Sequence, residues 1–171
     1  LSALTAITGS LETAITASSR VLAVQGQVVP ATNVDVRLWA ELENGERIDG
    51  ESAIGKARLP IVRIGCYPSR PPALPRAIEA IRNAEIILIG PGSLYTSILP
   101  NLLVPEIVEE IEKSSAPKLY ICNLMTQPGE TDGLDVTGHV RAIESQLAST
   151  GTTRKIFSSI LAQDELENSP L

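Results

Sequence analysis

Aromatic rings, histidine and cysteine are all scarce in this sequence. Its 171 residues include one Trp, three Tyr, one Phe, one His and two Cys. So few rings leave little for a stacking platform of the kind that binds single-stranded nucleic acid. Positive charge is not in excess either, because 14 Lys and Arg stand against 20 Asp and Glu, a net charge of −6, without a basic run. We therefore expect no nucleic-acid partner.

The two cysteines exclude a disulfide framework and a zinc site. Cys66 and Cys122 lie far apart, each beside apolar residues, and no Cys-x-x-Cys pattern accompanies them. With a single histidine in the chain, a zinc site has too few of its usual ligands. We interpret both cysteines as reduced core thiols of a cytoplasmic protein. No apolar run approaches the roughly 20 residues of a membrane-spanning helix, so we expect no membrane span.

Strand-like and helix-like segments alternate in the C-terminal half of the chain. Strands are predicted at 85–89, 118–124 and 155–161, and helices at 105–113 and 137–147. This alternation is typical of a parallel sheet with right-handed crossovers. The run of branched apolar residues from 86 to 89 predicts a strand that is covered on both faces.

The N-terminal half has a different pattern. Helices are predicted at 1–7, 10–18 and 74–82, and strands at 21–24, 34–42 and 61–66. Ser10 suits the N-cap of the second helix, and Asn44-Gly45 is a strong signal for a tight hairpin turn. The two patterns together predict an α/β fold with a mainly parallel sheet and an antiparallel hairpin region in the middle of the chain.

A glycine-rich turn follows the strand at 85–89. Gly90 and Gly92 permit a sharp turn and leave no side chain between backbone N–H groups and an incoming anion. Ser93, Thr96 and Ser97 can donate to phosphate oxygens or cap the start of a helix. Taken by itself, this turn is more simply an ordinary strand-to-helix connection. Its tyrosine could cover a sugar or base, or pack against the next helix.

The loop after the next strand concentrates amide, hydroxyl and carboxylate side chains. Asn123 and Gln127 can read a nucleobase or sugar hydroxyls, because each amide both donates and accepts hydrogen bonds. Thr126 and Thr131 can donate to phosphate. Glu130 could bind a ribose diol or a divalent metal, or cap the helix that follows. The alternative is a polar connection held by its own turns.

Both loops follow neighbouring strands of the predicted parallel sheet, at the edge where such sheets bind ligands. We therefore predict one ligand site built from both loops and assign it no catalytic residue. Its predicted members are Gly90, Pro91, Gly92, Ser93, Leu94, Tyr95, Thr96, Ser97, Asn123, Thr126, Gln127, Gly129, Glu130 and Thr131.

The order and spacing of these loops, with residues 100–104 between them, closely resemble the CofD-like superfamily. Within it, the match is to the bacterial gluconeogenesis-factor (YvcK-type) branch. This resemblance implies a Rossmann-like three-layer fold, a cytoplasmic location and binding of UDP sugars, notably UDP-N-acetylglucosamine, in the control of carbon metabolism and cell shape. The sister branch implies the alternative, a magnesium-dependent 2-phospho-L-lactate transferase acting on a nucleotide-diphosphate-linked substrate. A homo-oligomer is a further expectation that the sequence leaves open.

The sequence also departs from the family pattern. Family members open with a strand and a Gly-Gly-Gly-Thr-Gly loop, which is not found here, and have Arg where Gln27 stands. They also have Asp-His where this chain has Gly138-His139. We expect residues 1–171 to form one incomplete CofD-like domain, in three parts: a helical segment over 1–20, a hairpin region over 21–66 and the nucleotide-site region over 84–161.

His139 is open to two roles. It could act as a general base facing the site, or satisfy a neighbouring backbone group near the start of a helix. The structural role is favoured, because no carboxylate partner lies close to it in sequence.

Overall fold

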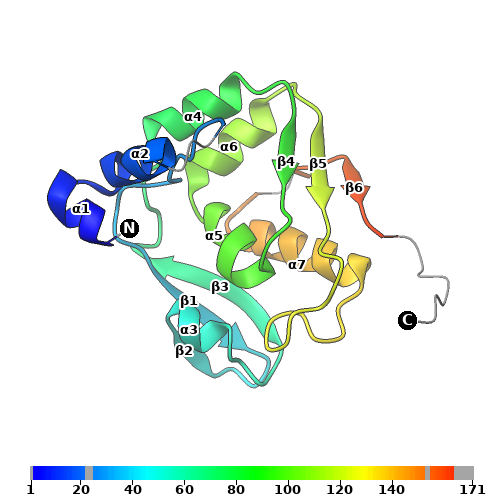
Figure 1. Ribbon diagram of the computed structural model, residues 1–171. Helices are drawn as coiled ribbons and strands as arrows, with labels where there is room; N and C mark the ends of the chain where they lie inside the picture. Colours follow the sequence, from blue (N-terminus) through cyan, green and yellow to red (C-terminus); the bar gives the residue numbers. More distant parts are fainter. Residues whose placement is uncertain (1, 22–24, 153–154, 164–171) are drawn as a thin grey trace, which may run out of the picture.

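Two three-stranded sheets, one antiparallel and one parallel, organise the residues that the computed structural model describes, namely 2–21, 25–152 and 155–163 (Figure 1). The antiparallel sheet comes from the middle of the chain and the parallel sheet from its C-terminal half, as the two sequence patterns predict. The α/β class, with a parallel sheet and an antiparallel hairpin region, is therefore confirmed.

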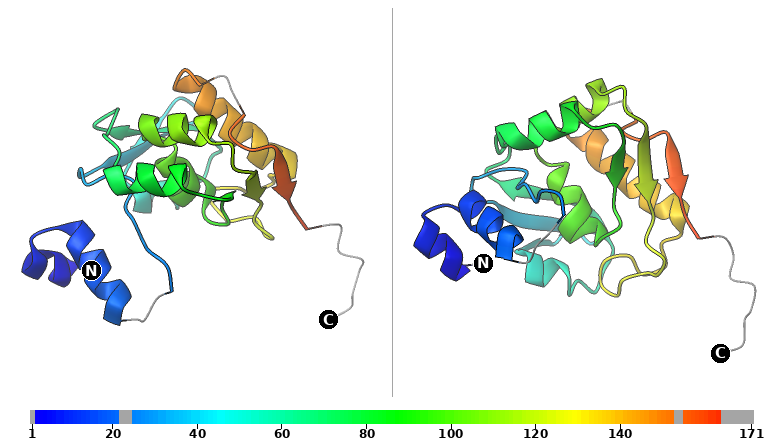
Figure 2. Two further views of the ribbon diagram at one scale, coloured as in Figure 1. Left: turned by 90° about the horizontal axis from the view of Figure 1, so that it is seen from above. Right: turned by 45° about the horizontal axis from the view of Figure 1, so that its top comes forward.

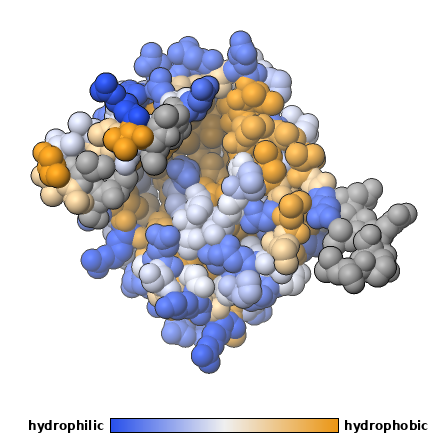
Figure 3. Space-filling model, in the orientation of Figure 1, coloured by the Kyte–Doolittle hydropathy of each residue, from blue (hydrophilic) through white to orange (hydrophobic). Residues whose placement is uncertain are grey.

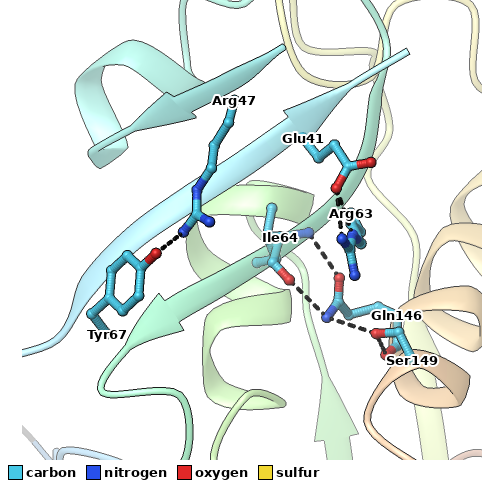
Figure 4. Close-up of polar contacts among 7 residues, drawn as sticks. All are labelled: Glu41, Arg47, Arg63, Ile64, Tyr67, Gln146 and Ser149. Atoms are coloured by element: carbon cyan, nitrogen blue, oxygen red, sulfur yellow. Dashed lines mark hydrogen bonds and ion pairs between the residues drawn. The ribbon is translucent and has the colours of Figure 1, made fainter. Parts of the chain in front are cut away.

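The antiparallel sheet has the strand order β2-β1-β3. Its strands are β1 (Arg37–Leu42), β2 (Arg47–Asp49) and β3 (Ile61–Tyr67), and the short helix α3 (Glu51–Ile54) follows β2. The predicted Asn44-Gly45 turn is confirmed: Gly45 has a φ of +81°, and the Asn44 side chain accepts a hydrogen bond from the Glu46 N–H at 2.9 Å. On the outer face of this sheet, Arg47 stacks on Trp39 and donates to the Tyr67 hydroxyl at 2.6 Å (Figure 4).

The parallel sheet has the order β4-β5-β6. Its strands are β4 (Ile87–Ile89), β5 (Lys118–Ile121) and β6 (Ser159–Leu161), and its crossovers contain α6 (Pro105–Lys113) and α7 (Val136–Ser149). The strands are added in one direction across the sheet, so right-handed crossovers place α6 and α7 on the same face. Figure 2 shows both helices on that side.

The opposite face of the parallel sheet is apolar and open within the described part of the chain. Ile86 and Leu88 are 53% and 52% exposed, while their neighbours Ile87 and Ile89 are buried under the helices. Figure 3 shows the resulting apolar band over β4, β5 and β6. The prediction that residues 86–89 are covered on both faces is wrong for the described residues, because the crossovers put helices on one face only.

Of the remaining helices, the first two lie at the N-terminal side of the molecule, the third packs beside α6, and the last two lie near the centre (Figure 1). They are α1 (Ser2–Thr8), α2 (Leu11–Val21), α4 (Pro75–Arg82), the π-helical turn η1 (Leu94–Ile98) and α5 (Leu99–Asn101). The Ser10 hydroxyl accepts a hydrogen bond from the Thr13 N–H at 3.1 Å, which confirms the predicted N-cap. The strand predicted at 21–24 begins on the last residue of α2, and residues 22–24 lie outside the described part.

Helix α7 joins the two sheets. Gln146, which is 3% exposed, accepts from the Ile64 N–H at 2.9 Å and donates to the Ile64 carbonyl at 3.0 Å, so its amide clamps strand β3 (Figure 4). The opposite end of α7 begins beside the second candidate loop. Cys66 and Cys122 are buried and unpaired in the core between these elements, and burial raises the pKa of both thiols. No helix in the described ranges is long and apolar enough to cross a membrane.

Candidate functional site

The first loop turns sharply at Gly90, against the end of strand β5. Gly90 has a φ of +86°, and a Cβ built there would lie 2.6 Å from the Ile121 carbonyl oxygen. Only glycine fits this conformation and this close approach. Gly92 differs, because a Cβ at that position would have its nearest neighbours at 3.7 Å, an ordinary contact. Packing therefore requires the glycine at 90 and does not require the one at 92.

Asn123 clamps the two loops together. Its Oδ1 accepts from the Gly92 N–H at 3.0 Å, and its Nδ2 donates to the Gly92 carbonyl at 2.8 Å. Both ends of the amide are thus engaged by one residue of the first loop, in the same arrangement by which Gln146 holds β3. The structure brings together the two loops that the sequence places 31 residues apart, as predicted.

Glu130 is the centre of a second set of contacts between the loops. It is 5% exposed, and its carboxylate accepts from the Tyr95 N–H at 3.1 Å and the Thr96 hydroxyl at 2.8 Å. Gln127 donates to the same carboxylate at 3.2 Å and accepts from the Ser93 hydroxyl at 2.7 Å. These charge-assisted bonds hold a buried carboxylate without an ion pair among the described residues. We call these residues and Asn123 the loop latch: Ser93, Tyr95, Thr96, Asn123, Gln127 and Glu130.

Tyr95 and Leu94 face the core. The Tyr95 ring is 5% exposed and its hydroxyl donates to the Ile61 carbonyl of β3 at 3.0 Å, which favours the packing alternative over a cover for a sugar or base. Burial, with the nearby Glu130 charge, raises the pKa of Tyr95. Leu94 is fully buried. The first loop is therefore anchored to the antiparallel sheet as well as to the second loop.

The second loop is also fixed from within. The Thr131 hydroxyl, fully buried, accepts from the Gln127 N–H at 2.7 Å. Gly129 has a φ of +85°, and a Cβ there would lie 3.1 Å from the carbonyl oxygens of Gly55 and Ala57. These contacts show that Thr131 and Gly129 shape the loop.

Asp135 is the N-cap of α7, a role that the sequence analysis gave as one alternative for Glu130. The Asp135 carboxylate accepts from the Gly138 N–H at 2.7 Å, whereas Glu130 points toward the first loop. The signal for Asp135 was available, because Asp is a preferred N-cap and stands directly before the helical residues. One turn later, the His139 Nδ1 lies 3.0 Å from the Asp135 carbonyl oxygen.

Three predicted site residues are exposed: Pro91, Ser97 and Thr126. The hydroxyls of Ser97 and Thr126 have no hydrogen-bond partner among the described residues. Gly92, Ser93, Thr96 and Gln127 are half-buried. A ligand can therefore reach fewer residues than the predicted set contains.

Two cavities lie near the loops. A cavity of about 230 Å³ opens at the end of β5, where Thr126 and His139 line it. A larger one, about 710 Å³, is lined by Gln27, Arg76 and Asn101. Asn101 connects this larger cavity to the first loop, since its Nδ2 donates to the Ser97 carbonyl at 2.7 Å.

Comparison with known proteins agrees with the loop motifs. Residues 1–170 match the family described as 2-phospho-L-lactate transferase CofD. The gluconeogenesis factor of Bacillus subtilis is 50% identical over 86% of this chain and 46% of its own length, and that of Listeria monocytogenes is 40% identical over 97% and 52%. A solved structure of a UPF0052-family member from Bacillus halodurans superimposes with a TM-score of 0.86, at 46% identity over 95% of this chain and 51% of that one. The chain spans about half the length of these relatives. It belongs to the CofD family, in which its named relatives are gluconeogenesis factors.

Proposed function

We propose that this chain binds a nucleotide sugar of the UDP-N-acetylglucosamine type, as part of a cytoplasmic protein that regulates carbon metabolism and cell shape. One observation carries the proposal. The two loops that define the family resemblance meet at the carboxyl edge of β4 and β5, where parallel sheets bind ligands. The relatives named gluconeogenesis factors support a regulatory role.

Within this site, some residues would contact the ligand and others hold the loops in place. The amide and carboxylate groups of Asn123, Gln127 and Glu130 are engaged with the first loop, so their role is to hold its backbone in place. The exposed hydroxyls of Ser97 and Thr126 are free to donate to phosphate or sugar oxygens. Gly92, whose side-chain position is open, lets a ligand approach the backbone closely.

The larger cavity supports a ligand of this size. Its volume of about 710 Å³ lies within the usual range for small-molecule sites. Arg76 lines its wall, and its guanidinium is already paired with the Glu12 carboxylate and donates to Gln27, at 2.9 Å each.

The second candidate is transfer chemistry of the phospholactate-transferase kind, favoured by the description of the matched family. That reaction implies magnesium, which prefers oxygen ligands such as carboxylates. The donor set of the described residues does not fit it. Glu130 is the only carboxylate at the loop interface and its oxygens accept from three protein donors, and no group of three His, Cys, Asp or Glu in the described ranges could hold a metal. We derive no step through magnesium.

Calorimetric titration of UDP-N-acetylglucosamine into the chain tests the proposal, with and without magnesium and with guanosine diphosphate as the comparison ligand. We expect saturable binding of the UDP sugar that does not need magnesium and exceeds that of guanosine diphosphate. Preference for guanosine diphosphate together with a magnesium requirement would favour the transferase. Absence of binding by either ligand would contradict the proposal for this chain.

A further inference from the structure

One buried polar atom beside the candidate site has no hydrogen-bond partner. His139, the only histidine of the chain, is 3% exposed on the first turns of α7. Its Nε2 has no partner among the residues that the structure describes. A buried nitrogen left unpaired is costly, and proteins rarely keep one without a reason.

The contact made by the other ring nitrogen fixes what Nε2 can do. Nδ1 lies 3.0 Å from the Asp135 carbonyl oxygen. Because a carbonyl oxygen only accepts hydrogen bonds, Nδ1 must carry the proton. In the neutral imidazole, Nε2 is then a bare acceptor, which only an N–H or O–H donor can satisfy.

His139 lines the cavity of about 230 Å³ at the end of β5. On the outer wall of this cavity, Leu124 and Met125 are 75% and 82% exposed, so the cavity borders solvent. Thr126, with its unpartnered hydroxyl, is also part of the lining. A residue with an unpaired buried nitrogen thus lines a cavity at the edge of the loop site.

Two other polar groups of the same cavity are already engaged. The Asn123 amide is paired with both backbone groups of Gly92, and the Asp135 carboxylate accepts from the Gly138 N–H. Among the described residues of the lining, His139 Nε2 is therefore the buried side-chain atom without a partner.

We propose that His139 binds ligand directly, with Nε2 accepting a hydrogen bond from an N–H or O–H of the bound molecule. This inference rests on the proposed nucleotide-sugar function and names the chemistry of one contact: a sugar hydroxyl, an acetamido N–H or the imide N–H of uracil. The imidazole then has two roles. Nδ1 satisfies the helix backbone, as the sequence analysis favoured, and Nε2 reads the ligand.

Nitrogen NMR of the imidazole tests this contact directly, because a single histidine gives unambiguous signals. The ¹⁵N-labelled chain is examined at mildly alkaline pH, alone and with UDP-N-acetylglucosamine, UDP or N-acetylglucosamine in separate samples. We expect a protonated Nδ1 and a bare Nε2 in the free chain. On binding, the Nε2 resonance should move toward the protonated range. Movement with UDP assigns the donor to the nucleotide, and movement with N-acetylglucosamine assigns it to the sugar.

An Nε2 signal that stays still with all three probes, or that is protonated in the free chain, would overturn the inference. Calorimetry on the same samples tests the proposed function separately, because it measures whether UDP-N-acetylglucosamine binds at all. Binding of UDP-N-acetylglucosamine with an unmoved Nε2 contradicts the His139 contact alone. Movement with UDP or N-acetylglucosamine, in a chain that fails to bind the UDP sugar, contradicts the proposed function alone.

Two matched variants separate ligand binding from folding. His139→Asn keeps a nitrogen near the position of Nδ1 and removes the Nε2 acceptor, whereas His139→Gln places its amide near the position of Nε2. We expect about tenfold weaker binding of UDP-N-acetylglucosamine by His139→Asn and binding closer to wild type by His139→Gln. A His139→Asn chain that unfolds at the same temperature as wild type and binds equally well would contradict the inference.

Discussion

The loop latch and the start of α7 differ in how their polar groups are satisfied, although they lie side by side at one sheet edge. In the latch, Glu130 accepts from three donors and the Asn123 amide is paired at both ends. At the start of α7, the buried His139 Nε2 has no partner among the described residues. The Thr126 hydroxyl of the adjoining second loop is exposed and has no protein partner there either. Residue type alone does not distinguish the two groups. Their partners do: the satisfied groups build the scaffold, and we infer that the unpaired groups at this edge meet the ligand.

The largest effect should come from breaking the centre of the latch. Glu130→Ala removes the acceptor of the buried Tyr95 N–H and of the half-buried Thr96 hydroxyl, leaving both unpaired. We expect a loss of about 3 kcal/mol or more in the free energy of unfolding, measured by urea denaturation. A loss below about 1 kcal/mol would mean that water replaces these contacts and that the latch does not support the fold.

A second test compares the two glycines of the first loop. Gly90→Ala forces a side chain into a positive φ and against the Ile121 carbonyl, so it should cost about 2 kcal/mol or more. Gly92→Ala has room for its methyl group and should change stability by within about 0.5 kcal/mol. Equal losses in thermal unfolding for the two variants would contradict the division between structural and ligand-facing positions.

The side-chain amides of Gln146 in the core and Asn123 in the site each pair with both backbone groups of one residue, so their loss can be compared. Gln146→Leu leaves the Ile64 N–H and carbonyl unpaired in the interior, and we expect a loss of about 2 kcal/mol. Asn123→Leu removes the same pair of bonds from half-buried Gly92, where water can replace them, and should cost about 1 kcal/mol. The reverse order in denaturant titrations would show that the site clamp is the more protected of the two.

The smallest effect is expected at the surface, where α4 and α6 are bridged. The Arg82 guanidinium, by hydrogen bonding, lowers the pKa of Glu110 to about 2, from 4.5. Because the folded pKa is depressed, the stabilisation is fully present above about pH 4.5 and disappears as the pH falls toward 2. Arg82→Met should therefore unfold more easily than wild type at pH 7, and the difference should become small at pH 2, where about half of the folded-state Glu110 carboxyls are protonated. If the denaturation midpoints of Arg82→Met and wild type differ as much at pH 2 as at pH 7, the pair does not act through the Glu110 charge.

Much of the fold could be predicted because its signals are local. The Ser10 cap, the Asn44-Gly45 turn and the alternation of strands and helices after residue 84 depend on neighbouring residues. The predicted segments coincide with α6 and overlap β5 and α7. The open face of β4 could not be predicted from its apolar run, because coverage depends on where the crossover helices pack. The roles of Asn123 and Glu130 could not be predicted either, since their partners lie more than 30 residues away and are chosen by side-chain geometry.

The central claim is that some loop residues support the fold and others contact the ligand. Calorimetric titration of UDP-N-acetylglucosamine into a Ser97→Ala/Thr126→Ala double variant tests this claim most directly. Ser115→Ala is the matched control, because Ser115 is exposed just before β5, at the opposite edge of the sheet. Our account predicts at least tenfold weaker binding by the double variant, with an unchanged unfolding temperature and wild-type binding by the control. Equal affinity in all three chains would contradict the claim that the unsatisfied hydroxyls of the two loops contact the ligand.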